Sequence, residues 1–384
     1  MENIPYGRQN ITDEDIEAVI SALKSDFLTQ GPKIAEFEIA FSKYIGSKYA
    51  VAVANGTAAL HLSTLALGVQ PGDKVITTPI TFAASANCVR YCGGEVIFAD
   101  IDPNTYLLDI NAVKTLLEAA PKGTYKGIIP VDFAGLAIDL EAFKQLAKEY
   151  DLWIIEDACH SPGGYFIDSK GNKQYCGNGN FADLAVFSFH PVKHIACGEG
   201  GMITTNSEDL YKKLILLRTH GITKDPLQLQ ENHGGWYYEM QELGYNYRLT
   251  DFQAALGNSQ LKMAEERIQR RTDIAKVYNN HFKQKSYILS QSGLVDGHAY
   301  HLYIIHTSRR KELYNFLKSK DIYCQIHYIP VHKMPYYANL MPKGTIFPFS
   351  EDYYSTCLSL PMYPTLTYEE QSFVISQIDD FFNP

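Results

Sequence analysis

Short apolar runs alternate with amphipathic stretches over residues 49–205 of the chain. Runs that are this short and this continuously apolar are typical of buried strands, and helical periodicity in the stretches between the first five indicates crossover helices. Together they predict an α/β fold with a mostly parallel sheet that has helices on both faces. The expected strands are 49–53, 74–78, 95–99, 127–131, 152–156, 183–187 and 201–205, and the expected helices between the first five are 57–67, 82–91, 110–119 and 139–149.

Different patterns precede and follow this region. Residues 12–24 are expected to form a helix capped by Thr12, and Pro32 fits the first turn of a second helix. The polar, aromatic and turn-rich residues 222–248 predict a long loop or hairpin, and one long helix is expected over 250–281. The remaining pattern indicates a smaller α+β unit with a strand at 301–306, a helix at 310–319, a strand at 322–327 and a helix at 367–380.

Length and charge narrow the class of protein. The chain has 384 residues, a length that suggests two or three domains. We expect a large α/β domain over 1–250, and a long connecting helix with a small α+β domain over 251–384. The formal net charge of -9 gives no reason to expect a nucleic-acid partner, because a phosphate backbone selects for basic faces. A local pocket for an anionic substrate remains compatible with this charge.

Nothing in the sequence predicts a membrane segment, a secretory signal or a metal site. The first ten residues, MENIPYGRQN, contain neither a basic region nor an apolar segment, and no apolar run approaches the roughly 18 residues that a membrane span needs. The chain has 7 cysteines and no CxxC pair, which argues against a disulfide framework and against a structural zinc site. We therefore expect a cytoplasmic protein.

Candidate chemistry falls at the carboxyl ends of the expected strands, where open parallel sheets bind ligands. Asn55, Gly56 and Thr57 join the strand 49–53 to a helix, and the free N–H groups at that helix start favour a phosphate. The alternative is an ordinary capped helix. Asp157 follows the strand 152–156, where a buried carboxylate needs a partner such as a protonated ring nitrogen. The alternative for Asp157 is a cap of the next turn.

A lysine stands in the third such segment. Lys193 lies between the strand 183–187 and the glycine-rich residues 198–201. Burial would lower its pKa and favour the neutral amine, which can condense with an aldehyde, whereas a solvated side chain is the alternative for any single lysine. The three segments together would supply a phosphate anchor, a carboxylate and an amine, which are the parts that pyridoxal phosphate requires.

An ordered set of motifs covers nearly the whole chain. They are FLTQGP (27–32), ANGTAAL (54–60), TPITFAASAN (78–87), EDACH (156–160), SFHPVKHIACGEGG (188–201), RTHGI (218–222) and GYNYRLTDFQAALG (244–257). In these motifs the chain resembles the DegT-type sugar-nucleotide aminotransferases, a branch of the fold-type I pyridoxal-phosphate enzymes. The resemblance implies the fold-type I transferase architecture with a smaller C-terminal domain.

The resemblance also implies roles for individual residues. Lys193 would hold pyridoxal phosphate as a Schiff base and later shuttle the proton, Asp157 would pair with the pyridinium nitrogen, and His160 would lie near the ring hydroxyl. Phe82 would stack on the cofactor ring. The phosphate would be bound by Gly56, Thr57 and Ser188, and Asn246 would reach the cofactor phosphate in the neighbouring subunit. The implied active unit is a homodimer with shared active sites.

Within the family, SFHPVKHI and the segments 234–251 and 326–337 are most similar to transaminases of pseudaminic acid biosynthesis. This implies transfer of an amino group from L-glutamate to C4 of a UDP-linked 4-keto-6-deoxy-N-acetylhexosamine, with pyridoxamine phosphate as the intermediate form of the cofactor. The segment 161–180 is long for the family and is expected to alter a surface hairpin. The candidates for the sugar and nucleotide pocket are Tyr6, Gln30, His327 and Tyr328, with ordinary packing as the alternative role for each.

Other functions compete with this interpretation. The motifs around the cofactor do not separate it from an aminotransferase for another nucleotide-linked 3- or 4-keto sugar. Related dehydratases carry histidine in place of the lysine, whereas here Lys193 holds that position and His194 follows it. A non-catalytic regulatory protein of the same fold would be expected to lose Lys193 or Asp157, and both are present. A dinucleotide-dependent oxidoreductase is disfavoured because no G-x-G-x-x-G motif opens a helix after the first strand.

Overall fold

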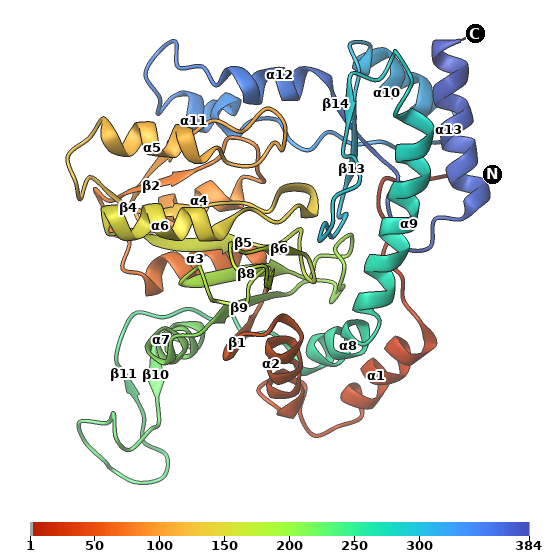
Figure 1. Ribbon diagram of the computed structural model, residues 1–384. Helices are drawn as coiled ribbons and strands as arrows, with labels where there is room; N and C mark the ends of the chain where they lie inside the picture. Colours follow the sequence, from red (N-terminus) through yellow and green to blue (C-terminus); the bar gives the residue numbers. More distant parts are fainter. Residues whose placement is uncertain (1–2, 384) are drawn as a thin grey trace.

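A seven-stranded sheet forms the centre of the computed structural model, which describes residues 3–383 (Figure 1). Its strand order is β1-β9-β8-β5-β4-β2-β3. The pairs from β8 through β3 are parallel, whereas β9 is antiparallel to both β1 and β8. The predicted mostly parallel sheet is therefore confirmed. Its strands are β1 (Tyr49–Val53), β2 (Lys74–Thr77), β3 (Glu95–Phe98), β4 (Tyr125–Ile129), β5 (Trp153–Asp157), β8 (Leu184–Ser188) and β9 (Gly201–Thr205).

Helices cover both faces of this sheet, as the apolar pattern predicted. One face packs against α3 (Gly56–Ala66), α4 (Ala84–Tyr91) and α7 (Glu208–Arg218), and the other against α2 (Pro32–Ile45), α5 (Ile110–Glu118) and α6 (Leu140–Tyr150). Successive side chains of a strand point to opposite faces, so Ile129 and Ile155 enter one core while Ile128 and Ile154 enter the other. Both faces of these strands are consequently apolar.

The N-terminal helices begin where their sequences predict. Thr12 caps α1 (Asp13–Leu23) in a capping box with Asp15, and Pro32 occupies the first turn of α2. The single helix expected over 250–281 is wrong. The chain forms α8 (Asp251–Leu261) and α9 (Ala264–Phe282), which point in different directions (Figure 1). Tight i→i−3 hydrogen bonds close the end of α8, so the two helices are separated without a proline.

A second, three-stranded antiparallel sheet lies in the C-terminal part of the chain. It consists of β12 (Ser290–Gln291), β13 (Tyr303–His306) and β14 (Cys357–Leu360). The expected strand 322–327 is wrong, because this segment makes only the isolated bridges of Ile322 to Ile4 and Gln325 to Ser359. The helices of this part are α10 (Arg310–Ser319), η2 (Val331–Lys333), α11 (Pro335–Ala338), α12 (Pro348–Thr356) and α13 (Tyr368–Phe382).

Two short hairpins lie outside the large sheet. The strands β6 (Tyr165–Ile167) and β7 (Lys173–Tyr175) form a short hairpin within the segment 161–180. The predicted hairpin over 222–248 is confirmed by the pairing of β10 (Ile222–Thr223) with β11 (Glu239–Met240), and it extends away from the rest of the protein (Figure 1). The boundary between two domains at residue 250 stays a prediction, and α8 beyond it packs against α1 and α2.

Within residues 3–383, no helix combines the length and the apolar character that crossing a lipid bilayer demands.

Candidate active site

A cavity of about 430 Å³ opens at the carboxyl ends of β5 and β8. This is the edge where an open parallel sheet binds its ligands. The loop after β1 and the segment around residue 327 complete its walls. Most of the predicted site residues line this cavity, namely Tyr6, Gly56, Thr57, Phe82, Asp157, His160, Ser188, Lys193, His327 and Tyr328.

One end of the cavity is suited to a phosphate group. The side chain of Asn55 caps α3 by accepting a hydrogen bond from the N–H of Ala58 at 2.8 Å. The N–H groups of Gly56 and Thr57 precede it in the same first turn, where helix geometry leaves them available to an anion. A Cβ atom at Gly56 would lie 2.9 Å from Cβ of Ser188, so only glycine lets the helix start approach this serine. Main-chain N–H groups and the Ser188 hydroxyl thus form a cradle that fits a phosphate.

A buried carboxylate marks the middle of the cavity. Asp157 ends β5 and is 5% exposed. Its Oδ2 accepts a hydrogen bond from Oγ of Ser85 at 2.7 Å, and its Oδ1 accepts one from the N–H of Cys159 at 3.2 Å. Both donors are neutral, and no lysine, arginine or histidine in the described part of the chain pairs with Asp157. A cationic ring nitrogen would therefore find here a buried carboxylate that no basic side chain occupies.

Ser85 is a contact that the sequence analysis missed. It lies in the motif TPITFAASAN, one helical turn after Phe82, and its Oγ also lies 2.7 Å from Oγ of Thr81. Its position one turn after Phe82 was the signal in the sequence that could have placed Ser85 near the cofactor. Its partner Asp157 is 72 positions away in the sequence, so no local pattern indicates their contact. Phe82 itself is 62% exposed at the rim of the cavity, which leaves its ring free to stack on a ligand.

Lys193 adds an amine to the cavity that Asp157 lines. It lies in the loop between β8 and β9 and is half-buried in the cavity wall. Burial lowers the pKa of Lys193 to about 8, although the negative charge of Asp157 acts in the opposite direction. A substantial fraction of the amine is thus neutral near physiological pH, as its proposed role requires. Its Nζ lies 3.4 Å from Nε2 of His301, a second residue that the sequence analysis did not single out.

A directed hydrogen-bond chain runs from the main chain into the cavity through His160. The N–H of Ala134 donates to Nδ1 of His160 at 3.2 Å, so the ring proton occupies Nε2. Burial lowers the pKa of His160 well below its usual value, and the ring is neutral. Its Nε2 lies 3.0 Å from Oη of Tyr328 and donates to it, which leaves the Tyr328 hydroxyl proton free to point into the cavity.

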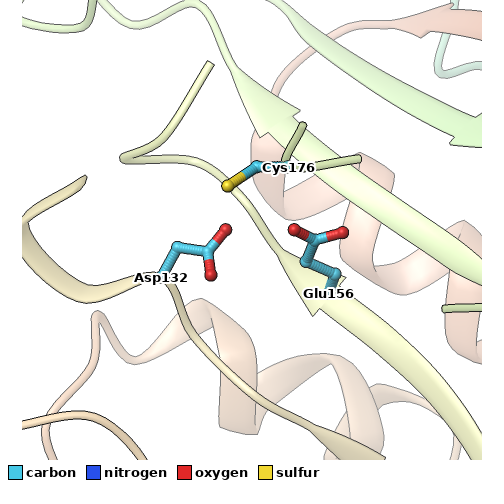
Figure 2. A group of neighbouring side chains, drawn as sticks. All are labelled: Asp132, Glu156 and Cys176. Carbon is cyan, nitrogen blue, oxygen red and sulfur yellow. The ribbon is translucent and has the colours of Figure 1, made fainter. Parts of the chain in front are cut away.

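Behind β5 lies a buried cluster of Asp132, Glu156 and Cys176, whose ligand-type atoms lie within 4.8 Å of one another (Figure 2). Asp132 accepts a hydrogen bond from Oγ of Ser161 at 2.6 Å, and Glu156 accepts one from the N–H of Gly177 at 2.8 Å. Burial and the nearby Asp132 raise the pKa of Glu156 well above its usual value. A neutral Glu156 therefore lies close to Asp132 and connects β5 to the main chain at Gly177. The expectation that the protein has no metal site stays a prediction.

Two predicted site residues lie outside this cavity. Gln30 is exposed and has a left-handed backbone conformation (φ 57°) just before α2. Asn246 forms an isolated bridge with Thr219 beside the base of the projecting hairpin. Neither residue lines the cavity of its own chain, and the roles predicted for them stay predictions.

A phosphate cradle at a helix start, a buried carboxylate and a half-buried amine at one sheet edge define a pyridoxal-phosphate enzyme. The chain belongs to the DegT/DnrJ/EryC1/StrS aminotransferase family, whose model matches residues 9–379. It is therefore a pyridoxal-phosphate-dependent sugar aminotransferase, and the family and cofactor predicted from the motifs are confirmed. Sugar aminotransferases among the similar solved structures include pyridoxal-phosphate and pyridoxamine-phosphate forms.

Individual relatives are similar over almost their full length. The chain is 38% identical to the spore coat polysaccharide biosynthesis protein SpsC of Bacillus subtilis, with 98% of this chain and 96% of that protein covered. It is 36% identical to the UDP-4-amino-4,6-dideoxy-N-acetyl-beta-L-altrosamine transaminase of Campylobacter jejuni, with 97% and 95% covered. Helicobacter pylori PseC, an aminotransferase of pseudaminic acid biosynthesis, matches with a TM-score of 0.88 at 30% identity and full coverage of both chains.

Proposed function

We propose that the protein transfers an amino group from L-glutamate to C4 of a UDP-linked 4-keto-6-deoxy-N-acetylhexosamine. The product is UDP-4-amino-4,6-dideoxy-N-acetyl-β-L-altrosamine, an intermediate of pseudaminic acid biosynthesis. The observation that carries the reaction class is the cavity that combines Lys193, Asp157 and the start of α3. The support for the substrate is the similarity to the Campylobacter transaminase and to PseC.

The residues of the cavity have distinct tasks in this reaction. Bound pyridoxal phosphate supplies an aldehyde carbon that carries the amino group and a ring that accepts electron density. Nζ of Lys193, neutral in part because its pKa is about 8, would take the α-proton of the amino donor and return it at the former aldehyde carbon. General-base action of this kind is worth about 10²–10⁴-fold in rate. Asp157 would keep a proton on the ring nitrogen, and the N–H groups of Gly56 and Thr57 would hold the phosphate.

The sugar enters from the side formed by the N-terminal and C-terminal segments. Tyr6 and His327 lie on the cavity wall with their ring centroids 5.2 Å apart, and Tyr328 follows directly. Burial lowers the pKa of His327 to about 3, so this ring stays neutral and can donate or accept a hydrogen bond. We assign these three side chains to the sugar, because they line the same cavity as Lys193.

The substrate proposal is tested by offering the purified protein pyridoxal phosphate, glutamate and a panel of UDP- and dTDP-linked keto sugars. Mass spectrometry identifies the sugar that acquires an amine, and Lys193→Ala serves as the inactive control. We expect the UDP-linked 4-keto-6-deoxy-N-acetylhexosamine to react fastest. If only dTDP-sugars react, this substrate is wrong, while the family assignment stands.

A second candidate function is amination of another nucleotide-linked 3- or 4-keto sugar for a polysaccharide. The observation that favours it is the 38% identity to SpsC, a spore coat polysaccharide biosynthesis protein. The same panel of sugars separates the two candidates, because it shows which keto sugar acquires the amine.

The proposed active unit is a homodimer in which Asn246 reaches the cofactor phosphate of the neighbouring chain. Asn246 lies beside the hairpin but outside its own cavity. The hairpin exposes large apolar side chains, with Leu227 94%, Trp236 75% and Leu243 78% accessible. Exposed apolar side chains in such a number are typical of a contact surface.

Mixed dimers test this arrangement directly. Lys193→Ala and Asn246→Ala chains are each expected to be poorly active, but a heterodimer of the two contains one site with both residues intact. Random mixing should then restore roughly a quarter of the wild-type activity. Activity that stays at the level of the two separate variants would contradict sharing of the site.

The proposed location is the cytoplasm, in line with cysteines that are all unpaired within residues 3–383.

A further inference from the structure

His301 is a cavity-lining residue that has no part in the chemistry described so far. It lies just before β13 and is 4% exposed. Its Nε2 lies 3.4 Å from Nζ of Lys193, and its ring is 4.4 Å from that of His160 between centroids. Its Nδ1 has no hydrogen-bond partner among the described residues. The lysine amine is therefore the polar group that this ring meets.

The main chain around His301 is held from one side by a buried guanidinium. Arg271 is 1% exposed and donates through NH1 to the carbonyl oxygens of Tyr300 at 3.2 Å, His301 at 3.2 Å and Met362 at 2.9 Å. Tyr300 has a left-handed backbone conformation (φ 47°), which aromatic residues rarely adopt. Such a conformation persists when the surroundings determine it, and these three hydrogen bonds provide part of that constraint.

The opposite side of the main chain around His301 is held by Ala134 and Gly135, the segment that also orients His160. The N–H of Ala299 donates to the carbonyl oxygen of Gly135 at 2.8 Å, and the N–H of Leu302 donates to that of Ala134 at 3.1 Å. Gly135 has φ 99°, and a Cβ atom there would lie 2.9 Å from the nitrogen of His301. A side chain at Gly135 would thus displace His301. The rings of His160 and His301 are therefore positioned by one shared loop.

The surroundings of the His301 ring keep the lone pair of its Nε2 available. The charged and titratable groups that act most strongly on it are Lys193, His160, His194 and Arg271. Burial, followed by the charge of Lys193, lowers the pKa of His301 well below its usual value. The neutral ring can carry its proton on Nδ1 and present Nε2 as an acceptor.

We propose that His301 is a positioning residue whose Nε2 accepts a hydrogen bond from Nζ of Lys193 whenever the lysine is not bonded to the cofactor. This inference rests on the proposed role of Lys193. A free lysine side chain has a flexible stem and would lose its place beside the reacting carbon. The hydrogen bond holds the amine where it exchanges its proton. His301 acts on the reaction through Lys193 and needs no contact with the sugar.

Two amide variants test the hydrogen bond. The oxygen of His301→Gln reaches the position of Nε2, whereas the oxygen of His301→Asn is one methylene shorter and does not. His306→Asn is the matched control, because His306 is also buried (3% exposed) at the end of β13 but lies outside the cavity. The first measurement is the pH dependence of pyridoxal phosphate attachment to the cofactor-free protein, followed by borohydride trapping and peptide mapping. The second is the single-turnover rate with glutamate.

We expect His301→Gln and His306→Asn to behave like the wild type. His301→Asn should shift the midpoint of attachment to lower pH, because the protonated amine loses an acceptor, and should slow the single turnover about 10–100-fold without changing glutamate affinity. If His301→Asn does not fold by circular dichroism, His301→Leu replaces it with the same expectation. Equal behaviour of the Asn (or Leu) and Gln variants overturns the inference. A wild-type label on a residue other than Lys193 overturns the proposed function instead.

Discussion

Replacing Lys193 by methionine is expected to stabilise the cofactor-free protein at neutral pH. Burial lowers the pKa of Lys193 from 10.5 to about 8 in the folded protein, whereas the unfolded chain keeps the ordinary value. Well below pH 8 the amine is mostly protonated in both states, and the folded state bears nearly the full cost of the half-buried charge. Between pH 8 and 10.5 the folded state loses the proton first, so the stability of the wild type rises with pH in this window.

The magnitude follows from the same pKa values. The fall from 10.5 to about 8 corresponds to about 3 kcal/mol, since each pKa unit is worth roughly 1.4 kcal/mol. This is an upper limit, because Lys193 lies in the wall of a cavity that water enters and its charge is partly screened. We expect Lys193→Met to be more stable than the wild type by about 1–2 kcal/mol at pH 7, with the difference shrinking steadily toward pH 10.

Urea unfolding of both proteins without cofactor, at one protein concentration and at pH 7, 8.5 and 10, measures this difference. Other groups titrate equally in both proteins, so their contributions cancel in the comparison. Lys343→Met, at an exposed position, is the control and should show no such pH dependence. A difference between Lys193→Met and the wild type that is the same at all three pH values would refute a half-buried, destabilised ammonium group at this site.

Three further changes have defined outcomes. Asp157→Asn should slow the glutamate half-reaction by about 10²-fold or more while the cofactor remains bound, as stopped-flow absorbance would show. Gly56→Ala places a methyl group 2.9 Å from Cβ of Ser188 and should weaken pyridoxal phosphate binding about tenfold or more, measured by fluorescence titration, with the melting temperature little changed. Gly221→Ala would push its Cβ atom into a carbonyl oxygen across the hairpin, and it should weaken the dimer in sedimentation experiments. Gly46→Ala is the control. Gly46 has the same left-handed conformation, but its added Cβ would meet no atom, so the dimer should stay intact.

Some structural features could not be read from the sequence, and each has an identifiable reason. The break between α8 and α9 falls at Lys262 and Met263, where neither glycine nor proline interrupts the helical pattern. The third strand of the small sheet is β14, while the equally apolar segment 322–327 makes only isolated bridges, because strand pairing depends on which partner edge is free. Propensity alone does not contain that information.

Local patterns determined the strands of the large sheet, the capped start of α1, the hairpin over 222–248 and the motifs that contain Lys193 and Asp157, because periodicity, caps and turn residues act over a few neighbouring positions. Only the tertiary structure decided how these pieces meet. It brought Ser85 to Asp157, set the ring proton of His160 through Ala134, and placed His301 beside a lysine 108 positions earlier in the chain. Contacts between distant segments arise from packing of the whole chain. No short stretch of sequence therefore shows which residues will meet or which of them will donate the hydrogen bond.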